Sequence, residues 1–497
     1  VGLSEPDCGS ADGLTANVTP AGRGDAFVYL NGPVPFDSGS YVCVAQGGSN
    51  STFQALVTMP KPVPRDQQGV VLGTWTEDGR ERMAITAAMN ANQFQFQVLF
   101  PGILSWLTRG VHLGTERNYY SVQVDDVFLA DDRWQCKDPA ACTDPARTIL
   151  MKPEDVDELI KWQDRNNMQL ELAFNAGGCK YPTEAGQPAL CEALTKNWSA
   201  FSWVNHTYDH PNLDQVVEGE DPPLRESIAG QIQLNIEFAK TYSNPRHFSA
   251  KELVTGQHSG LKRVPLKEDK GLDDDNEFLI KTLDSQKISW ISSDNSRDSE
   301  QHAIGEGTKT VPRYPMNIFY NVERMSEETD QYNWAYTSAD DGGKGVCQPN
   351  CIPKLNLTDG FQTYIVPTEA RTALQHVLAN SPRPHYVHQP NLTGDRIIYP
   401  VLDAILSKYN LVFASNAELL HPNMSEFGEE LQNQKQWGKL SGVRATVAAG
   451  KLTITGSVSA NVPLTLPSTA QNTGSLKPYA GSLTGWCAPG ELEKIQL

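Results

Sequence analysis

The sequence predicts an α/β protein in which a parallel β-sheet, open or closed into a barrel, is covered by helices and flanked by β-rich regions at both ends. Two observations support this fold class. Between about residues 106 and 425, short apolar runs alternate with segments of helical periodicity, whereas residues 1–105 and 426–497 contain mainly strand-like runs. The chain of 497 residues is also long enough for about three domains.

The N-terminal part, residues 1–105, is expected to be an accessory β-rich region that could bind carbohydrate. Strand-like runs such as "AFVYLNGPVPFDSGSYVCVAQ" and "GVVLGTW" are separated by turn residues. The run "FQFQVLF" at residues 94–100 alternates apolar and polar residues, which predicts a further strand. The proline-rich "MPKPVPRDQQG" at residues 59–69 is typical of a connection between elements.

The central part, residues 106–425, carries the alternating pattern of the sheet and its helices. Parallel sheets are covered by helices on their faces, and polar groups at the C-terminal ends of their strands form the sites of such folds. The expected strands are 119–126, 170–176, 201–208, 252–257, 288–294, 385–389 and 411–416. The expected helices are 153–163, 224–242, 277–286, 369–380 and 399–410.

The C-terminal part, residues 426–497, returns to short strand-like runs such as "VRATVAAGKLTITGSVSANVPLTLP". It shows almost no helical periodicity. Because neither terminal part is large alone, we expect this part to complete a β-sandwich with the N-terminal strands.

Charge and hydropathy exclude two classes of protein. The formal net charge of −18 and the pI near 5.0 argue against nucleic-acid binding, which requires a clustered basic surface. The longest apolar run, "VLFPGILSWL", falls well short of the ~20 residues that span a bilayer. We therefore expect no membrane span, and we expect the protein to act as a monomer.

Cysteines and glycosylation motifs together predict a secreted, eukaryotic glycoprotein. Six of the nine cysteines form pairs that are close in sequence and lack zinc-ribbon spacing, so disulfides are expected. These pairs are Cys136/Cys142, Cys179/Cys191 and Cys347/Cys351, whereas the pairing of Cys8, Cys43 and Cys487 is left open. The N-x-S/T motifs lie at Asn17, Asn50, Asn197, Asn205, Asn356, Asn391 and Asn423, and we expect no glycan at Asn205 or Asn391, which flank site candidates.

Polar residues at the ends of the expected strands are the site candidates. They are Asp125, Asp126, His206, His210, Asp294 and His388. Considered alone, an aspartate pair is usually part of a solvated loop and a lone histidine is usually structural. Together, two histidines four residues apart and a carboxylate are a common ligand set for a catalytic divalent metal ion. Asp131 and Asp132 lie beyond the first strand, where a solvent-facing or substrate-rim position is expected.

Three motifs resemble the NodB-homology polysaccharide deacetylases. "VDDV" and "HTYDH" match the family's Asp-Asp strand end and H-[ST]-x-x-H segment, and "YVHQP" resembles its late histidine motif. The resemblance implies a distorted (β/α) barrel in which Asp126, His206 and His210 hold a divalent metal, most often Zn²⁺. It further implies that Asp125 is the general base and His388 the general acid.

The chain also departs from the family pattern around these motifs. Gln257 and His258 stand where an arginine that orients the base is expected. "PRYP" at residues 312–315 makes Arg313 a candidate for that role, and Asp294 stands in the place of a family aspartate that tunes the acid histidine.

The function expected from this resemblance is hydrolysis of N-acetyl groups on an extracellular amino-sugar polysaccharide. The longer segments "NYYSVQVDDVFL", "NHTYDHPNL" and "YVHQPNLTG" are similar to fungal enzymes that deacetylate galactosaminogalactan. One rival hypothesis is a carbohydrate-binding wall protein with an inactive barrel. Another is a glycoside hydrolase, which needs two carboxylates roughly 5 to 9.5 Å apart and no metal.

Overall fold

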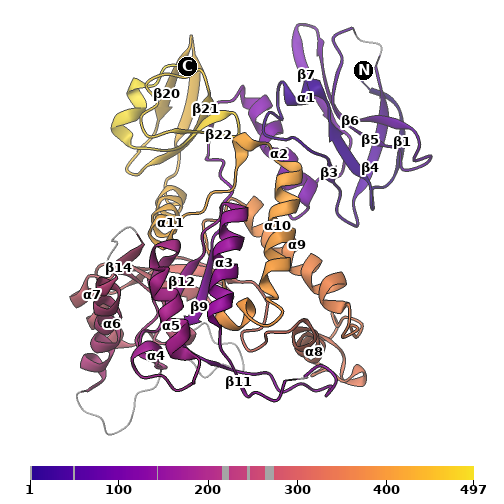
Figure 1. The fold of residues 1–497 in the computed structure, drawn as a ribbon. Coiled ribbons are helices and arrows are strands. Elements are labelled where there is room, and N and C mark those ends of the chain that lie inside the picture. Colours follow the sequence, from indigo (N-terminus) through magenta and orange to yellow (C-terminus); the bar gives the residue numbers. More distant parts are fainter. Residues whose placement is uncertain (1–2, 49–50, 143, 215–222, 243–246, 263–273) are drawn as a thin grey trace.

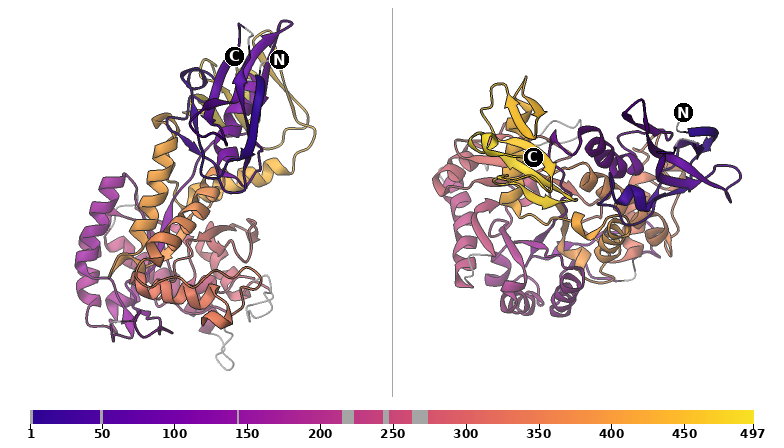
Figure 2. Two further views of the ribbon diagram at one scale, coloured as in Figure 1. Left: turned by 90° about the vertical axis from the view of Figure 1, so that its right-hand side faces the viewer. Right: turned by 90° about the horizontal axis from the view of Figure 1, so that it is seen from above.

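The computed structural model describes residues 3–48, 51–142, 144–214, 223–242, 247–262 and 274–497. The chain forms a central α/β barrel and two β-rich parts, one near each terminus (Figure 1). Both β-rich parts lie beyond the same end of the barrel, and from above they cover different sides of it (Figure 2). No helix in the described ranges is long and apolar enough to cross a bilayer.

The barrel is built from parallel strands, which confirms the fold class expected from the sequence. The sheet runs in the order β15-β14-β13-β12-β9-β18-β17, and pairing of β15 with β17 closes it. The short β16 (Ala303–Ile304) joins β17 in antiparallel fashion. The barrel strands are β9 (Val122–Val127), β12 (Glu171–Phe174), β13 (Ser202–Asn205), β14 (Phe248–Leu253), β15 (Trp290–Asp294), β17 (Thr308–Pro315) and β18 (His385–His388).

Helices cover the outside of the barrel, and four of those given below, α4, α5, α8 and α11, were not expected from the sequence. Buried positions of α8 include Glu327, Glu328 and Asp330, so this helix lacks an apolar stripe. The segment containing α11 was assigned to the β-rich tail. The helices are α3 (Pro153–Asn166), α4 (Gly177–Lys180), α5 (Gln187–Lys196), α6 (Pro223–Thr241), α7 (Glu277–Gln286), α8 (Met325–Tyr336), α9 (Val366–Leu378), α10 (Ile398–Val412) and α11 (Met424–Gly438).

The strand expected at residues 411–416 is wrong. Leu411 and Val412 end α10, and Phe413 packs its ring on Tyr409 of the same helix. The apolar run continues the buried stripe of α10 and does not start a strand. A run this short cannot be assigned to a helix or a strand from periodicity alone.

The N-terminal part contains one sheet, whose strands lie in a different order from that of the chain, followed by a helix. Its strands are ordered β1-β4-β6-β5-β2-β3, with β7 on β6. They are β1 (Leu3–Ser10), β2 (Thr15–Val18), β3 (Val34–Pro35), β4 (Tyr41–Gly47), β5 (Gln54–Pro60), β6 (Gln68–Glu77) and β7 (Arg80–Ile85), and α1 is Pro20–Arg23. The strand expected at residues 94–100 is instead the start of helix α2 (Phe94–Thr108), because Phe94, Val98 and Gly102 share one buried helical face.

The C-terminal part forms its own sheets and does not extend the N-terminal one. In its larger sheet, β21 pairs with β23 and with β8 (His112–Leu113), the segment that leads into the barrel. Its strands are β19 (Arg444–Ala448), β20 (Lys451–Thr455), β21 (Val462–Pro467), β22 (Lys477–Tyr479) and β23 (Ser482–Cys487). Because β8 precedes β9, this sheet lies toward the N-terminal end of the barrel strands.

The three disulfides expected from local spacing are all present. Cys136–Cys142, Cys179–Cys191 and Cys347–Cys351 each close a short loop, and Cys8 bonds to Cys43 across β1 and β4. Cys487 is a buried free thiol. The sequons at Asn205 and Asn391 are buried, in agreement with the expectation that they carry no glycan.

The N-terminal end of the barrel is closed by α11 over two buried glutamates. The Met424 amide donates to Glu171 Oε1 (3.4 Å), and the Ser425 amide donates to Glu252 Oε1 (3.1 Å). Burial raises the pKa of Glu171 to about 6; burial and the neighbouring Glu171 raise that of Glu252 to about 8. The fold therefore favours the neutral form of these carboxyl groups.

Glu252→Gln should remove much of the loss of stability at alkaline pH. A carboxyl group with a raised folded-state pKa stabilises the fold fully below its unfolded value near 4.5 and loses that contribution as pH rises through about 8. In urea unfolding at pH 9, the variant should be more stable than the wild type by roughly 1–3 kcal/mol, and at pH 5 the two should be similar. An equal difference at both pH values would contradict this assignment.

Candidate functional site

The candidate residues meet in one cavity at the C-terminal ends of the barrel strands. The cavity has a volume of about 460 Å³. It lies at the end of the barrel opposite the two β-rich parts, where the segments that follow the strands, β11 (Thr148–Ile149) and α4, are found (Figure 1). It is lined by Asp125, Asp126, Ala130, Asp131, Asp132, His206, His210, Gln257, His258, Asp294, Arg297, Tyr320, Tyr386 and His388.

A bulge in β9 turns both of its terminal aspartates toward the cavity. In a regular strand, neighbouring side chains point to opposite faces. Here the register with β12 shifts between Val124 and Val127, and Asp126 adopts a left-handed backbone with φ of 64°. An extra residue of this kind bends a strand and redirects its side chains. The left-handed backbone is unfavourable for aspartate and is typical of functional sites.

Asp126, His206 and His210 form a cluster that could hold a metal ion. Asp126 Oδ1 lies 3.2 Å from His206 Nε2 and 3.1 Å from His210 Nε2. The ligand atoms of all three side chains lie within 4.8 Å of one another. His210 itself has a φ of 55° and its ring lies against Gly256, where a Cβ would approach within 2.8 Å.

The hydrogen bonds around this cluster fit a divalent cation. His206 Nδ1 lies 3.1 Å from the Val254 carbonyl oxygen, so the neutral ring donates there and Nε2 carries a lone pair. Asp126 Oδ1 and His206 Nε2 are buried, and within the described part of the chain neither forms a hydrogen bond. Two facing acceptors repel each other unless a cation or a proton lies between them. The donor set of one carboxylate and two imidazoles suits zinc.

Asp125 is held by a two-pronged interaction with Arg313. The guanidinium Nη1 and Nη2 donate to Asp125 Oδ1 (2.8 Å) and Oδ2 (2.7 Å), and the arginine is fully buried. Burial acts to raise the pKa of Asp125, but the charge of Arg313 and neighbouring imidazoles outweighs it and holds that pKa far below its usual range. Asp125 is therefore ionised, as a base must be before it accepts a proton.

His258 and Gln123 hold Arg313 from two further sides. His258 Nε2 accepts from Arg313 Nη2 (2.7 Å), and Gln123 Oε1 accepts from Nη1 (3.1 Å). Burial and the adjacent guanidinium lower the pKa of His258 to about 3, so its ring stays neutral and remains an acceptor. The Tyr386 ring covers the guanidinium at 4.3 Å. His258 thus stands beside the base-orienting arginine instead of replacing it.

His388 ends β18 beside Asp125 of β9, and its ring lies 5.9 Å from that of Tyr386, which covers Arg313. Its Nε2 is 3.8 Å from Asp126 Oδ2, and its ring lies 5.6 Å from that of Tyr320. Burial lowers the pKa of His388, so the free imidazole is neutral at neutral pH. Asp294 accepts hydrogen bonds from Tyr386 and Ser296, and no contact between Asp294 and His388 is found among the described residues.

Asp131 lies deeper in the cavity wall than a rim position implies, whereas Asp132 is exposed. Asp131 Oδ2 accepts from Gln389 Nε2 (2.8 Å), and burial together with the nearby Asp126 raises the pKa of Asp131 well above its usual value. The sequence did not point to Tyr320, Tyr386 or Arg297. Tyr386 could have been found from the sequence. Residues two apart on a strand point to the same face, so Tyr386 shares the face of His388.

Arg313→Met should destabilise the protein by about 3–5 kcal/mol, because it leaves the buried Asp125 carboxylate without a partner. Adding Asp125→Asn to this variant should recover part of the loss. Urea unfolding of the two single variants and the double variant measures the coupling. Additive losses would show that the two side chains do not stabilise each other.

Metal content should separate the ligands from their neighbours. A site of this kind should hold about one zinc ion per chain, measured by mass spectrometry of the dialysed protein. Asp126→Ala, His206→Ala and His210→Ala should each lose most of that zinc. Asp125→Asn and the exposed Asp132→Asn are the matched controls and should retain it. Retention of zinc by all three alanine variants would place the metal elsewhere.

Comparison with known proteins identifies a shared fold. No family model and no curated protein sequence matches the chain. The crystal structure of Agd3, described as a novel carbohydrate deacetylase, superposes with a TM-score of 0.72 at 16% identity, covering 95% of this chain and 79% of that one. A chitin deacetylase from Colletotrichum lindemuthianum is far less similar, with a TM-score of 0.28 at 11% identity. The match covers 60% of this chain and 85% of that one and supports no conclusion. The chain has the fold of the carbohydrate deacetylase structure over nearly its whole length, which confirms the resemblance at the level of the fold.

Proposed function

We propose that this protein is a metal-dependent deacetylase that hydrolyses N-acetyl groups of an extracellular amino-sugar polysaccharide. The observation that carries the proposal is the Asp126, His206 and His210 cluster beside the Arg313-bound Asp125, at the active end of this barrel. The products are acetate and a polymer with free amines. The fold shared with a carbohydrate deacetylase supports the same assignment.

The metal site and Asp125 would activate water. Asp126, His206 and His210 would hold a divalent ion, most suitably Zn²⁺, whose Lewis acidity lowers the pKa of water and polarises a carbonyl group. Asp125 remains ionised and fixed in orientation because both of its oxygens accept from Arg313. A carboxylate oxygen has a further lone pair, so Asp125 can still accept a proton from the attacking water.

His388 would supply the proton that the leaving group requires. An amine leaves an amide carbon readily only after its nitrogen is protonated. His388 lines the same cavity as Asp125, is its neighbour in the adjoining strand, and has its Nε2 3.8 Å from Asp126 Oδ2. Because burial lowers the pKa of His388, the free ring is neutral and would have to be protonated before it could donate a proton to the amide nitrogen.

We further propose that the substrate contains N-acetylgalactosamine, as in galactosaminogalactan. The support is the motif resemblance of the segments around Asp125, His206 and His388. Four disulfides and the several sequons support a secreted protein in the extracellular space or the cell wall. The β-rich parts would bind carbohydrate, and the protein would act as a monomer.

Acetate release provides the primary test. The protein should release acetate from N-acetylated galactosamine polymer, a chelator should abolish the release, and Zn²⁺ should restore it. New reducing ends without acetate would favour a glycoside hydrolase instead. Absence of acetate from every N-acetylated glycan, with metal bound, would support an inactive barrel that only binds carbohydrate.

Asp125→Asn should retain the metal and lose turnover by about 10²–10⁴-fold, the usual contribution of a general base. The substitution preserves the size of the side chain, and Asp132→Asn at the exposed rim is its matched control. Turnover and zinc content are measured on the same preparation. Turnover close to the wild-type value would remove Asp125 from the role of base.

A further inference from the structure

A pair of tryptophans with two lysines lies on the surface near the cavity. Trp134 and Trp334 are half-buried, and their ring centroids are 5.4 Å apart. The Lys137 ammonium lies 4.8 Å from the Trp134 ring and 5.5 Å from the Trp334 ring, and the Lys344 ammonium lies 5.5 Å from the Trp334 ring. Both lysines are exposed. We call these four residues the tryptophan platform.

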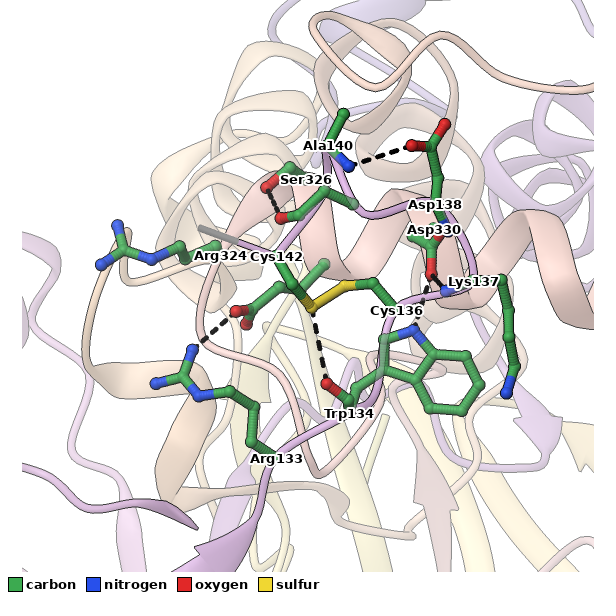
Figure 3. Close-up of a disulfide and its surroundings, with 12 residues drawn as sticks. Arg133, Trp134, Cys136, Lys137, Asp138, Ala140, Cys142, Arg324, Ser326 and Asp330 are labelled. Atoms are coloured by element: carbon green, nitrogen blue, oxygen red, sulfur yellow. Dashed lines mark hydrogen bonds and ion pairs between the residues drawn. A yellow bond between two sulfur atoms is a disulfide. The ribbon is translucent and has the colours of Figure 1, made fainter. Parts of the chain in front are cut away.

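The platform is held rigidly by one buried aspartate and one disulfide (Figure 3). Asp330, 4% exposed on α8, accepts from the Trp134 indole (2.8 Å) and from the backbone amides of Lys137 (2.7 Å) and Asp138 (2.9 Å). Cys136–Cys142 closes the same loop. Trp334 follows Asp330 by one helical turn, so both belong to one face of α8. The tryptophans are therefore preorganised and lose little freedom when a ligand binds.

The platform lies close to the candidate cavity along the chain. Trp134 follows the cavity residue Asp132 by two positions, and two residues of chain span at most about 7 Å. The Trp134 amide donates to the Asn321 carbonyl (2.8 Å), and the adjacent Tyr320 lines the cavity beside His388. The two β-rich parts lie at the opposite end of the barrel and cannot prolong the cavity on this side.

We propose that the tryptophan platform is a subsite for the polymer. It binds N-acetylated sugar units that lie next to the unit in the cavity. The proposal rests on the proposed function. Aromatic rings offer an apolar face to the apolar face of a sugar ring, and the ammonium groups of Lys137 and Lys344 can donate to hydroxyl and acetyl oxygens. Cation–π contacts at exposed positions are weak, so the lysines can move aside or onto the ligand.

The charge of the platform favours the substrate over the product. Deacetylation converts a neutral unit into a cationic one. Lys137 and Lys344 repel that cation, whereas the carboxylates of the cavity attract it. The platform should therefore hold segments of the polymer that are still acetylated and release segments that have been converted.

Kinetics on a long and a short substrate test the subsite. For each variant, kcat/KM is measured on the N-acetylated polymer and on the N-acetylated disaccharide of the same sugar. Trp334→Ala and Trp134→Ala should each lower the polymer-to-disaccharide ratio of kcat/KM about tenfold, chiefly by raising KM for the polymer. Trp334→Tyr should recover most of the ratio. The matched control is Phe278→Ala, which removes a half-buried ring of α7 that has the Lys281 ammonium 5.3 Å from its centroid and should leave the ratio unchanged. An unchanged ratio in both platform variants would overturn the proposal.

Direct binding tests the subsite without turnover. In an Asp125→Asn background, Trp334→Ala should weaken retardation of the protein in affinity gels that contain the acetylated polymer. Lys137→Glu, a change at an exposed side chain, should increase retardation by the deacetylated polymer. Equal retardation of all variants by both polymers would overturn the platform. If the wild type binds polymer through the platform but releases no acetate, only the proposed function fails.

Discussion

The buried pair of Arg313 and Asp125 organises both the barrel interior and the candidate site. Arg313 donates to Asp125 on one side and to Gln123 on another, and Gln123 donates in turn to Glu171 at the closed end of the barrel. A polar column thus runs along the barrel axis from the mouth of the cavity to α11. A buried guanidinium is costly unless its donors are satisfied, and His258 Nε2 accepts from both Nε and Nη2, while the Tyr386 ring covers the guanidinium face. The catalytic geometry and the stability of the barrel therefore depend on the same contacts.

The two neighbouring aspartates acquire different roles because the backbone separates their environments. Asp125 remains in the strand and faces the fixed positive charge of Arg313. The left-handed backbone at Asp126 places its Oδ1 3.2 Å from His206 Nε2 and 3.1 Å from His210 Nε2. At Asp131, close by, burial and the charge of Asp126 favour the neutral form. Three carboxyl groups of one type thus differ in charge and partner through local packing alone.

The barrel and its main site residues could be predicted from the sequence because both depend on local patterns. Strand runs ending in Asp125, His206 and His388 follow directly from periodicity and from the rule that parallel strands present their C-terminal ends together. What could not be predicted depended on contacts between distant segments. Helix α8 buries several carboxyl groups, among them Glu327, which pairs with Arg133, so no apolar stripe revealed the helix. The bulge at Asp126 and the contact of His258 with Arg313 also require the folded barrel.

The central claim is that Asp126, His206 and His210 bind a divalent metal ion in the native protein. Anomalous diffraction recorded on both sides of the zinc absorption edge, from crystals of the purified protein without added metal, tests it most directly. The account predicts one strong peak within bonding distance of Asp126 Oδ1, His206 Nε2 and His210 Nε2, present above the edge and absent below it when the ion is zinc. No anomalous peak among these three side chains in protein that releases acetate would contradict the account.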